Sequence, residues 1–361
     1  MRSLAAWTAT AAIALMGAAH AQTATTGSAS ATDAATSTAA ASDPTLQTAL
    51  AGYASYQTDV TNLRAAQISS NDALEAALDR VARHNRDALT RGWIAYGAET
   101  AAQSPAFVQG VREAAAYYGR DAVIWALTVD PSYARGLRGG QEATRMLLDS
   151  ANADSARITA VADRYQEMAY SMQRQRWANA VAPGQAARLQ RIRSLGAPNA
   201  PVVALPDGVS PRLSVATLSI SPSSDPTVLG GRRFWDALNG GPDVVAVSST
   251  PVTYQWRVNP TRGAALDRMA AVAALQALDA VDTHQSAVSQ LISDPRTRDC
   301  FEMAQLQLYQ CMSAAHFRYE NAFCLGRHGL RDVGTCIAQV GQPDTTAMTP
   351  MPAAAATAAR Q

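Results

Sequence analysis

Apolar residues recur with the period of an α-helix between residues 44 and 195. Side chains spaced by about 3.6 residues fall on one helix face, which can pack against neighbouring helices. Gly119, Asp130-Pro131 and Gly139-Gly140 interrupt the pattern and predict helices near 121–129, 132–150 and 154–182. Residues 44–195 are therefore predicted to form an antiparallel helical bundle.

Two helix starts in this region carry capping signals. Asn71 and Asp72 offer an N-cap, with Glu75 in the first turn. Ser104 followed by Pro105 repeats the signal, because proline is tolerated in the first turn of a helix. Helices are therefore expected to begin near residues 71 and 105.

Residues 196–262 have a different pattern, because prolines are spread through the whole segment. Short β-capable pieces lie between the prolines, at Val202–Leu205, Leu213–Ile220 and Val244–Val247. So much proline argues against a regular sheet, so we expect a long irregular crossing or a small hairpin. Only Arg232–Leu238, with Phe234 and Trp235, has the pattern of a packed helical turn.

Residues 263–341 return to helical patterns and contain all four cysteines, Cys300, Cys311, Cys324 and Cys336. The stretch Ala264–Val281 is apolar on nearly all sides, which predicts a helix buried among several neighbours. Cys300 and Cys311 are close to three helical turns apart, so they share a face but lie about 16 Å apart. An antiparallel second helix would pair Cys311 with Cys324 and Cys300 with Cys336. Nested disulfides are the favoured pairing.

Two features of this segment leave alternatives open. The turn at 314–318 contains neither Gly nor Pro, and an unbroken helix would separate Cys311 from Cys324 by about 19 Å. Three glycines, Gly326, Gly329 and Gly334, also weaken the second arm as a regular helix. A zinc site is a further alternative, because His316 and His328 lie near two of the cysteines, although the short Cys-x-x-Cys hook is absent.

The two ends of the chain have the composition of non-globular segments. Residues 1–21 combine Arg2, an apolar stretch and Ala19-His20-Ala21, the three parts of a secretory signal peptide. Residues 22–43 and 342–361 are rich in Ala and Thr, and they are expected to be a disordered linker and tail. We expect a periplasmic or secreted protein that does not span the membrane, in which paired cysteines are oxidised.

Charge excludes several classes of function. All 30 basic Lys+Arg residues are Arg, so mechanisms that require a lysine ammonium group are ruled out. Without the leader, 29 Arg balance 29 Asp+Glu, and a neutral chain is a poor partner for nucleic acid.

No local motif indicates catalysis, and no cofactor or metal is predicted. The sequence lacks a Gly-x-Ser-x-Gly elbow, a His-Glu-x-x-His pair and a glycine-rich phosphate loop. Glu99 and Glu113 are the least improbable acids for a cell-wall hydrolase, but both are expected to face water. Aromatic residues could line a ligand groove, although core positions are expected at this spacing: Tyr53, Tyr56, Trp93, Tyr96, Tyr117, Tyr118, Trp125, Tyr165 and Trp177.

The sequence thus leads to three hypotheses. The first is a non-catalytic envelope protein, a helical scaffold or binding module for another envelope component or for itself. The second is a hydrolase of cell-wall glycan or peptide that uses a carboxylate such as Glu99 as its acid. The third is a small-ligand binding module that uses the aromatic residues.

Overall fold

The structure is a computed structural model that describes residues 44–218, 229–230, 233–240 and 256–343. The chain divides into two units, and every element described below belongs to the second, Ala40–Gln361. Four predictions fall on residues outside the described ranges: the signal peptide, the linker, most of the tail 342–361 and the β-capable piece Val244–Val247. The predicted tail begins too early, because Gln342 and Pro343 belong to a strand that pairs with residues 256–258.

The described residues are mainly helical, which confirms the predicted fold class. The helices of the first part are α1 (Pro44–Ala65), α2 (Asn71–Ala82), α3 (Arg86–Ala102), α4 (Pro105–Tyr118), α5 (Arg120–Val129), α6 (Tyr133–Gly136), α7 (Gly140–Met172) and α8 (Gln185–Leu195). Those that follow are α9 (Val209–Leu218), α10 (Phe234–Leu238), α11 (Ala264–Ala277), the 3-10 turn η1 (Asp282–His284), α12 (Gln285–Leu291), α13 (Pro295–Ala314), α14 (Arg318–Cys324), the π-helical segment η2 (Leu325–Arg331) and α15 (Asp332–Ala338).

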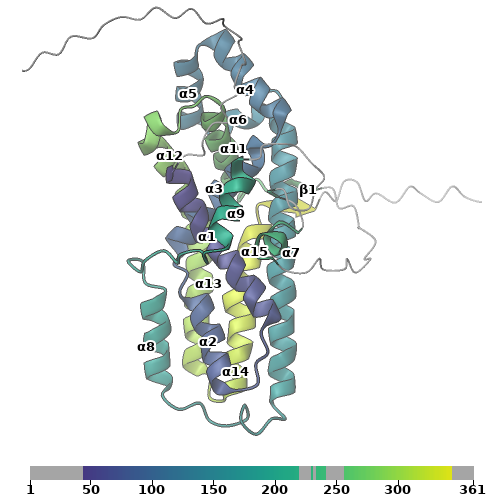
Figure 1. The fold of residues 1–361 in the computed structure, drawn as a ribbon, viewed down its shortest axis with the longest axis vertical. Helices are drawn as coiled ribbons and strands as arrows, with labels where there is room; N and C mark the ends of the chain where they lie inside the picture. The colour runs from purple at the N-terminus through teal and green to yellow at the C-terminus, as the bar shows by residue number, and fades with distance from the viewer. Residues whose placement is uncertain (1–43, 219–228, 231–232, 241–255, 344–361) are drawn as a thin grey trace, which may run out of the picture. The chain divides into compact units, whose positions relative to one another are not determined.

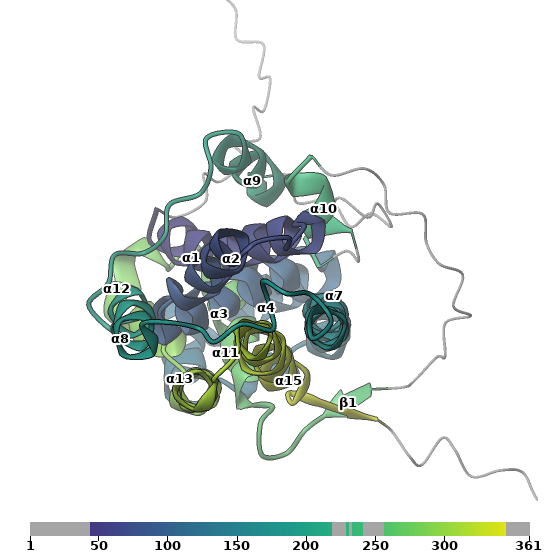
Figure 2. The same ribbon diagram turned by 90° about the horizontal axis from the view of Figure 1, so that it is seen from below.

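Helix α3 lies at the centre of the packing. It contacts α1, α4, α7, α11 and α13, and Figure 2 shows these helices around it. Every residue from Gly92 to Ala102 is buried, so this part of the helix has no solvent-facing side. Helix α11 packs against α3 and is itself buried on most sides, as its apolar pattern predicts.

Side-chain caps fix several helix starts. The Ser104 hydroxyl accepts from the backbone N–H of Phe107 and Pro105 opens α4, as predicted. Helix α2 also begins at the predicted place, but its cap is Ser70, whose hydroxyl accepts from Ala73 N. Asn71 is the first helical residue instead.

The prediction of separate helices at 132–150 and 154–182 is wrong. One helix, α7, runs without a break from Gly140 to Met172. Ser150 and Asp154, which flank the predicted gap, are both buried within this helix. Asp154 is satisfied there by partners from α1 and α10, which the local pattern does not show.

The proline-rich segment contains more helix than expected. Residues 209–218 form α9, where a β-capable piece was predicted at Leu213–Ile220. The only strands in the described ranges are β1 (Trp256–Val258) and β2 (Gly341–Pro343), which pair antiparallel. These two strands come from distant parts of the chain, so they do not form the expected local hairpin.

The C-terminal helices form the predicted hairpin with nested disulfides. Cys300 pairs with Cys336 and Cys311 with Cys324, with Cα–Cα distances of 5.8 Å and 5.6 Å. Helix α13 is one arm, and α14, η2 and α15 together form the other, which packs along α7 (Figure 1). Because all four sulfurs are in disulfides, the alternative zinc site does not form.

The π-helical segment explains how both disulfides close. Cys300 and Cys311 are 11 residues apart on α13, whereas Cys324 and Cys336 are 12 residues apart on the second arm. A stretch of 12 α-helical residues turns well beyond three full turns. A π-turn holds one more residue than an α-turn. The segment η2 lies between Cys324 and Cys336, so it absorbs the extra residue and returns Cys336 to the face of α13.

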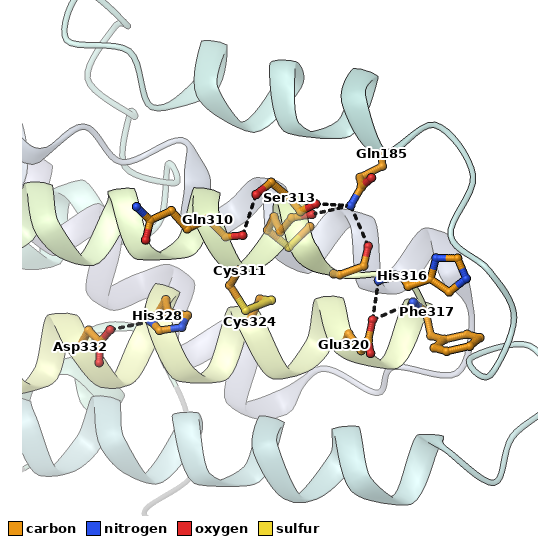
Figure 3. The surroundings of a disulfide bond; sticks show 12 residues. Gln185, Gln310, Cys311, Ser313, His316, Phe317, Glu320, Cys324, His328 and Asp332 are labelled. Carbon is orange, nitrogen blue, oxygen red and sulfur yellow. Dashed lines mark hydrogen bonds and ion pairs between the residues drawn. A yellow bond between two sulfur atoms is a disulfide. The ribbon is translucent and has the colours of Figure 1, made fainter.

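Tertiary contacts fix the hairpin turn, which lacks Gly and Pro. The backbone N–H groups of His316 and Phe317 both donate to the Glu320 carboxylate (Figure 3). The carbonyl of His316 accepts from Ala182 N at 2.9 Å, and Phe317 forms an isolated bridge with Val181. The turn is therefore built against the segment after α7, which explains why its own residues give no turn signal.

The glycines of the second arm mark its close approach to neighbouring helices. A Cβ at Gly326 would lie 2.9 Å from the carbonyl oxygen of Ala162 on α7. One at Gly329 would lie 2.9 Å from Val81 Cγ1 on α2. The expectation that the arm departs from a regular helix at its glycines is confirmed for Gly326 and Gly329, which lie in the π-helical segment η2. Their missing side chains also let the arm pack tightly against its neighbours.

None of the helices in the described ranges combines the length and the apolar character needed to cross a membrane.

Candidate functional site: an aromatic groove beside a disulfide

A groove of about 300 Å³ lies between the C-terminal end of α7 and the α13–α14 hairpin. Tyr170 of α7 and Gln173, directly after this helix, form one side, and the hairpin supplies Tyr319, Glu320 and Phe323. Its volume is at the lower end of the range typical of small-molecule sites. The remaining lining residues are small or cross-linked: Ala169, Ala314, Ala315, Cys311 and Cys324.

Three aromatic residues line the groove, Tyr170, Tyr319 and Phe323. Tyr170 and Phe323 lie edge to face, with centroids 6.4 Å apart and an interplanar angle of 71°. Tyr319 stacks on Phe317, with centroids 5.6 Å apart and ring planes 9° apart. Tyr170 is 62% exposed, so its ring is open to an incoming ligand. Large aromatic surfaces with polar tips are typical of ligand grooves.

The groove contains one charged side chain, that of Glu320. Its carboxylate is held in place by the backbone of His316 and Phe317, which makes it a fixed negative charge. No arginine lines the groove, although the chain contains 30 basic residues. The neighbouring Arg318 is engaged elsewhere, because its guanidinium donates to the Trp177 carbonyl at 2.8 Å.

The Cys311–Cys324 disulfide holds the two hairpin arms together at the groove (Figure 3). Gln185, at the start of α8, braces the same turn by donating to the carbonyls of Ser313 and Ala315. Ordering a binding site in advance lowers the entropic cost of ligand binding. The cross-link and the braced turn thus preorganise one wall of the groove.

The proposed acids lie elsewhere. Glu99 is 3% exposed, and its carboxylate accepts from Gln276 of α11 at 2.8 Å. The expectation that it faces water is wrong, because α3 is buried on nearly all sides. Glu113 is exposed as expected, but it pairs with Arg138 at 2.7 Å. The structure does not bring these two glutamates into the groove.

The aromatic residues singled out in the sequence divide into two groups. Tyr53, Tyr56, Trp93, Tyr96 and Tyr165 are core residues and Trp177 packs partly buried against the core, as expected, whereas Tyr117, Tyr118 and Trp125 are exposed. None of the nine lines the groove. Its rings were missed, although Tyr319 and Phe323 are four residues apart and precede Cys324, a spacing that places them on one helix face.

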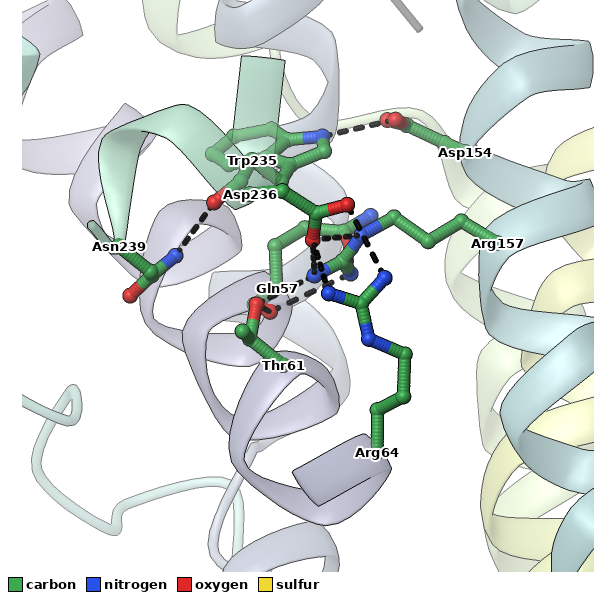
Figure 4. Close-up of polar contacts among 8 residues, drawn as sticks. All are labelled: Gln57, Thr61, Arg64, Asp154, Arg157, Trp235, Asp236 and Asn239. Carbon is green, nitrogen blue, oxygen red and sulfur yellow. Dashed lines mark hydrogen bonds and ion pairs between the residues drawn. The ribbon is translucent and has the colours of Figure 1, made fainter. Parts of the chain in front are cut away.

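A second group of polar residues is buried between α1, α7 and α10 (Figure 4). Tyr53 donates to Asp154 Oδ2 at 2.6 Å, and Trp235 donates to Oδ1 at 2.7 Å. Burial raises the pKa of Asp154 to about 6, although both hydrogen bonds oppose the shift. Beside it, Asp236 forms ion pairs with Arg157 at 3.1 Å and with Arg64 at 3.0 Å. We call these six residues the α10 anchor.

The α10 anchor is closed to ligands in this structure. Trp235 is 2% exposed and Asp154 3%, and the Trp235 ring lies 4.8 Å from that of Tyr96. Shifted pKa values occur at active sites but also in structural networks. Because each polar group here bonds to another side chain of the anchor, the arrangement fixes α10 on the bundle.

A further buried group joins α1 to α2. His84 Nε2 lies 2.7 Å from Asp59 Oδ2, and Arg83 donates to the same carboxylate. Burial lowers the pKa of His84, although its hydrogen bond to Asp59 opposes the shift. His84, Tyr56 and His328 line a cavity of about 40 Å³, which has room only for water-sized molecules.

In the described part of the chain, no cluster of three or more His, Cys, Asp or Glu side chains is placed to hold a metal ion. Comparisons of the sequence with protein-family models and curated proteins, and of the fold with solved structures, gave no match.

Proposed function

We propose that this protein is a non-catalytic binding module of the cell envelope, exported through its leader, and that the groove beside Cys311–Cys324 is its ligand site. The observation that carries the proposal is the combination of three aromatic lining residues with a covalently fixed hairpin. Such a surface offers contact area at low entropic cost.

The residues that line the groove argue for binding over catalysis. They include one carboxylate, no His and no Ser or Thr. A catalytic nucleophile is typically activated by an adjacent base, as in Ser–His or Cys–His pairs, and the groove lining contains no such pair. Glu320 has instead the role of a helix cap, since it accepts from two backbone N–H groups.

The cysteines and the leader support an oxidising location. Disulfides persist in the periplasm and outside the cell, whereas cytosolic reductants keep thiols reduced. Intact-mass measurement on protein recovered from its host tests this. A mass without residues 1–21 and without alkylatable thiols is expected, and a retained leader or four free thiols would contradict it.

A thermal-melting screen tests the ligand site. The mature protein would be melted in the presence of sugars, peptides, organic cations and organic anions, beside the variant Tyr170→Ala. A ligand that binds the native state raises the melting temperature of the wild type, and we expect the variant to lose most of the shift. Tyr118→Ala, at another exposed tyrosine, is the matched control and should keep the shift.

Two results would contradict the proposal. One is that no class of compound shifts the wild type, and the other is that Tyr170→Ala keeps the full shift. A zymogram on cell-wall substrate tests the hydrolase hypothesis in parallel. We expect no clearing from the wild type, and clearing that Glu99→Gln abolishes would overturn the non-catalytic proposal.

A further inference from the structure

The groove pairs aromatic rings with a carboxylate and excludes the chain's cations. Each aromatic ring has a negative face that attracts a cation within about 6 Å of its centroid. Tyr170 and Phe323 meet at 71°, so they form a corner whose two walls point in different directions. Glu320 adds a full negative charge to the same groove.

The single negative charge in the groove lining favours one class of ligand over others. No basic side chain lines the groove, so an anionic ligand would meet the carboxylate without a compensating charge. A neutral sugar would gain aromatic contacts and hydrogen bonds from its hydroxyls to the carboxylate, but it brings no positive charge to balance that of Glu320. A cation gains from both.

The hydrogen bonds that Glu320 already accepts favour one kind of cation over another. One of its carboxylate oxygens, Oε2, already accepts from His316 N and Phe317 N. A primary ammonium has three N–H donors that need acceptors when they leave water. A quaternary ammonium has none, so aromatic faces and a nearby negative charge satisfy it.

We infer that the groove binds a quaternary ammonium group, with Tyr170, Tyr319 and Phe323 around the cation and Glu320 as its counter-charge. This inference rests on the proposed function and assigns the ligand class of the same site. The group occurs in free choline and betaine and in the headgroup of choline lipids, which share this chemistry.

Calorimetric titration of the mature, oxidised protein tests the inference. The probes are choline and dimethylbutanol, the uncharged compound in which carbon replaces the choline nitrogen. The two have nearly the same shape, so a difference in affinity reports the charge. Choline is expected to bind at least roughly tenfold more tightly.

Variants then assign the contacts. Phe323→Leu and Tyr170→Leu each remove a ring but keep apolar bulk, and each is expected to weaken choline binding roughly 2- to 30-fold. Glu320→Gln should also weaken it, because the counter-charge is lost. Tyr118→Leu is the matched control and should leave binding unchanged. Melting curves without ligand confirm that each variant folds.

The outcomes separate this inference from the proposed function. Equal binding of choline and dimethylbutanol, or binding of a sugar or an anion in place of choline, overturns the inference and leaves a ligand groove. Binding of no compound overturns both. The comparison of probes on the wild type needs no variant, so a variant that fails to fold leaves the test intact.

An experiment with lipid vesicles distinguishes a lipid headgroup from a soluble compound as the source of the cation. The protein would be sedimented with phosphatidylcholine vesicles or with phosphatidylglycerol vesicles. Sedimentation with phosphatidylcholine alone, reversed by free choline, supports a lipid headgroup as the ligand. Binding of free choline without sedimentation supports a soluble ligand.

Discussion

The α10 anchor and the C-terminal hairpin both join segments that lie apart in the sequence, but by different chemistry. The anchor depends on ionisable and hydrogen-bonding groups buried between α1, α7 and α10. The hairpin depends on two covalent bonds between α13 and the second arm. The first should therefore respond to pH, and the second to reducing agents.

The difference also separates the two regions by function. The central groups of the anchor, Asp154 and Trp235, are buried and bonded within the cluster, so a ligand cannot reach them. In the hairpin two covalent bonds join the arms, and the aromatic residues Tyr319 and Phe323 are partly exposed. A region fixed by covalent bonds can thus keep a groove open to solvent, whereas the anchor has to stay buried.

The largest effect is expected from removal of the disulfides. The Cys300–Cys336 bond closes a separation of 36 residues, and Cys311–Cys324 closes one of 13. Since loop closure restricts the unfolded chain more for longer loops, we expect losses of about 4 and about 3 kcal/mol in the free energy of unfolding. Urea unfolding of Cys300→Ser/Cys336→Ser and of Cys311→Ser/Cys324→Ser measures both.

For the same two double variants, we expect the losses of ligand affinity to rank in the opposite order to the losses of stability. Loss of Cys311–Cys324 should weaken binding at the groove more, because this bond is part of its lining. Equal stability of both variants and the wild type would show that packing against α7 alone holds the hairpin.

The next effect is a pH dependence that arises from Asp154. Its pKa is raised from an ordinary value of 3.8 to about 6 in the folded protein, so the folded state binds a proton more tightly than the unfolded chain. Stability from this group is therefore complete below about pH 4, and it is lost as the pH rises through about 6. The shift corresponds to roughly 3 kcal/mol.

Asp154→Asn should remove this contribution. Other groups titrate with the opposite sign, since burial lowers the pKa of His84 and stability from that group falls as the pH drops below 6.5. The measured quantity is therefore the difference between wild type and variant at pH 4 and at pH 7. A difference that does not change with pH would mean that Asp154 keeps its charge when buried.

A smaller effect is expected where α1 crosses α3. A Cβ at Gly92 would lie 2.5 Å from Tyr53 N and 2.7 Å from Ala49 O, and neither backbone atom can move alone. Gly92→Ala should separate the helices and cost about 1–3 kcal/mol, measured by urea unfolding. Because Tyr53 belongs to the α10 anchor, Trp235 fluorescence should change as well.

Gly136→Ala is the matched control for this substitution. A Cβ at Gly136 meets no atom within 4 Å, so the change should be nearly neutral. Ligand binding at the groove should survive Gly92→Ala, since the disulfides hold the hairpin independently. Loss of binding together with stability would instead indicate that the two regions unfold as one.

Local patterns predicted the features that depend on near neighbours in the sequence. Helical periodicity, the cap at Ser104 and the apolar stretch after Ala264 all report interactions within a few turns. The nested disulfides followed from helix geometry together with oxidation. These features need no knowledge of the tertiary partner.

Features set by distant partners could not be predicted in this way. The turn at Phe317 is fixed by the segment around Val181, and α7 continues through Asp154 because this buried carboxylate meets α1 and α10. Glu99 is buried because α11 covers α3 and supplies Gln276. The groove was missed for the same reason, since Tyr170 meets Phe323 only after α7 packs against the hairpin.

The smallest effect is expected at the exposed ion pair of Glu113 and Arg138. The carboxylate and guanidinium are 2.7 Å apart, but their side chains are 47% and 61% exposed. Water and salt screen such a pair, so Glu113→Gln should cost less than about 1 kcal/mol in urea unfolding, and less still in high salt. The buried pair of Arg157 and Asp236, with side chains 8% and 10% exposed, sets the contrast. If breaking the exposed pair cost as much free energy of unfolding as breaking the buried one, burial would not determine how much an ion pair of this chain contributes to stability. The importance given to the buried ion pairs of the α10 anchor would then lose its basis.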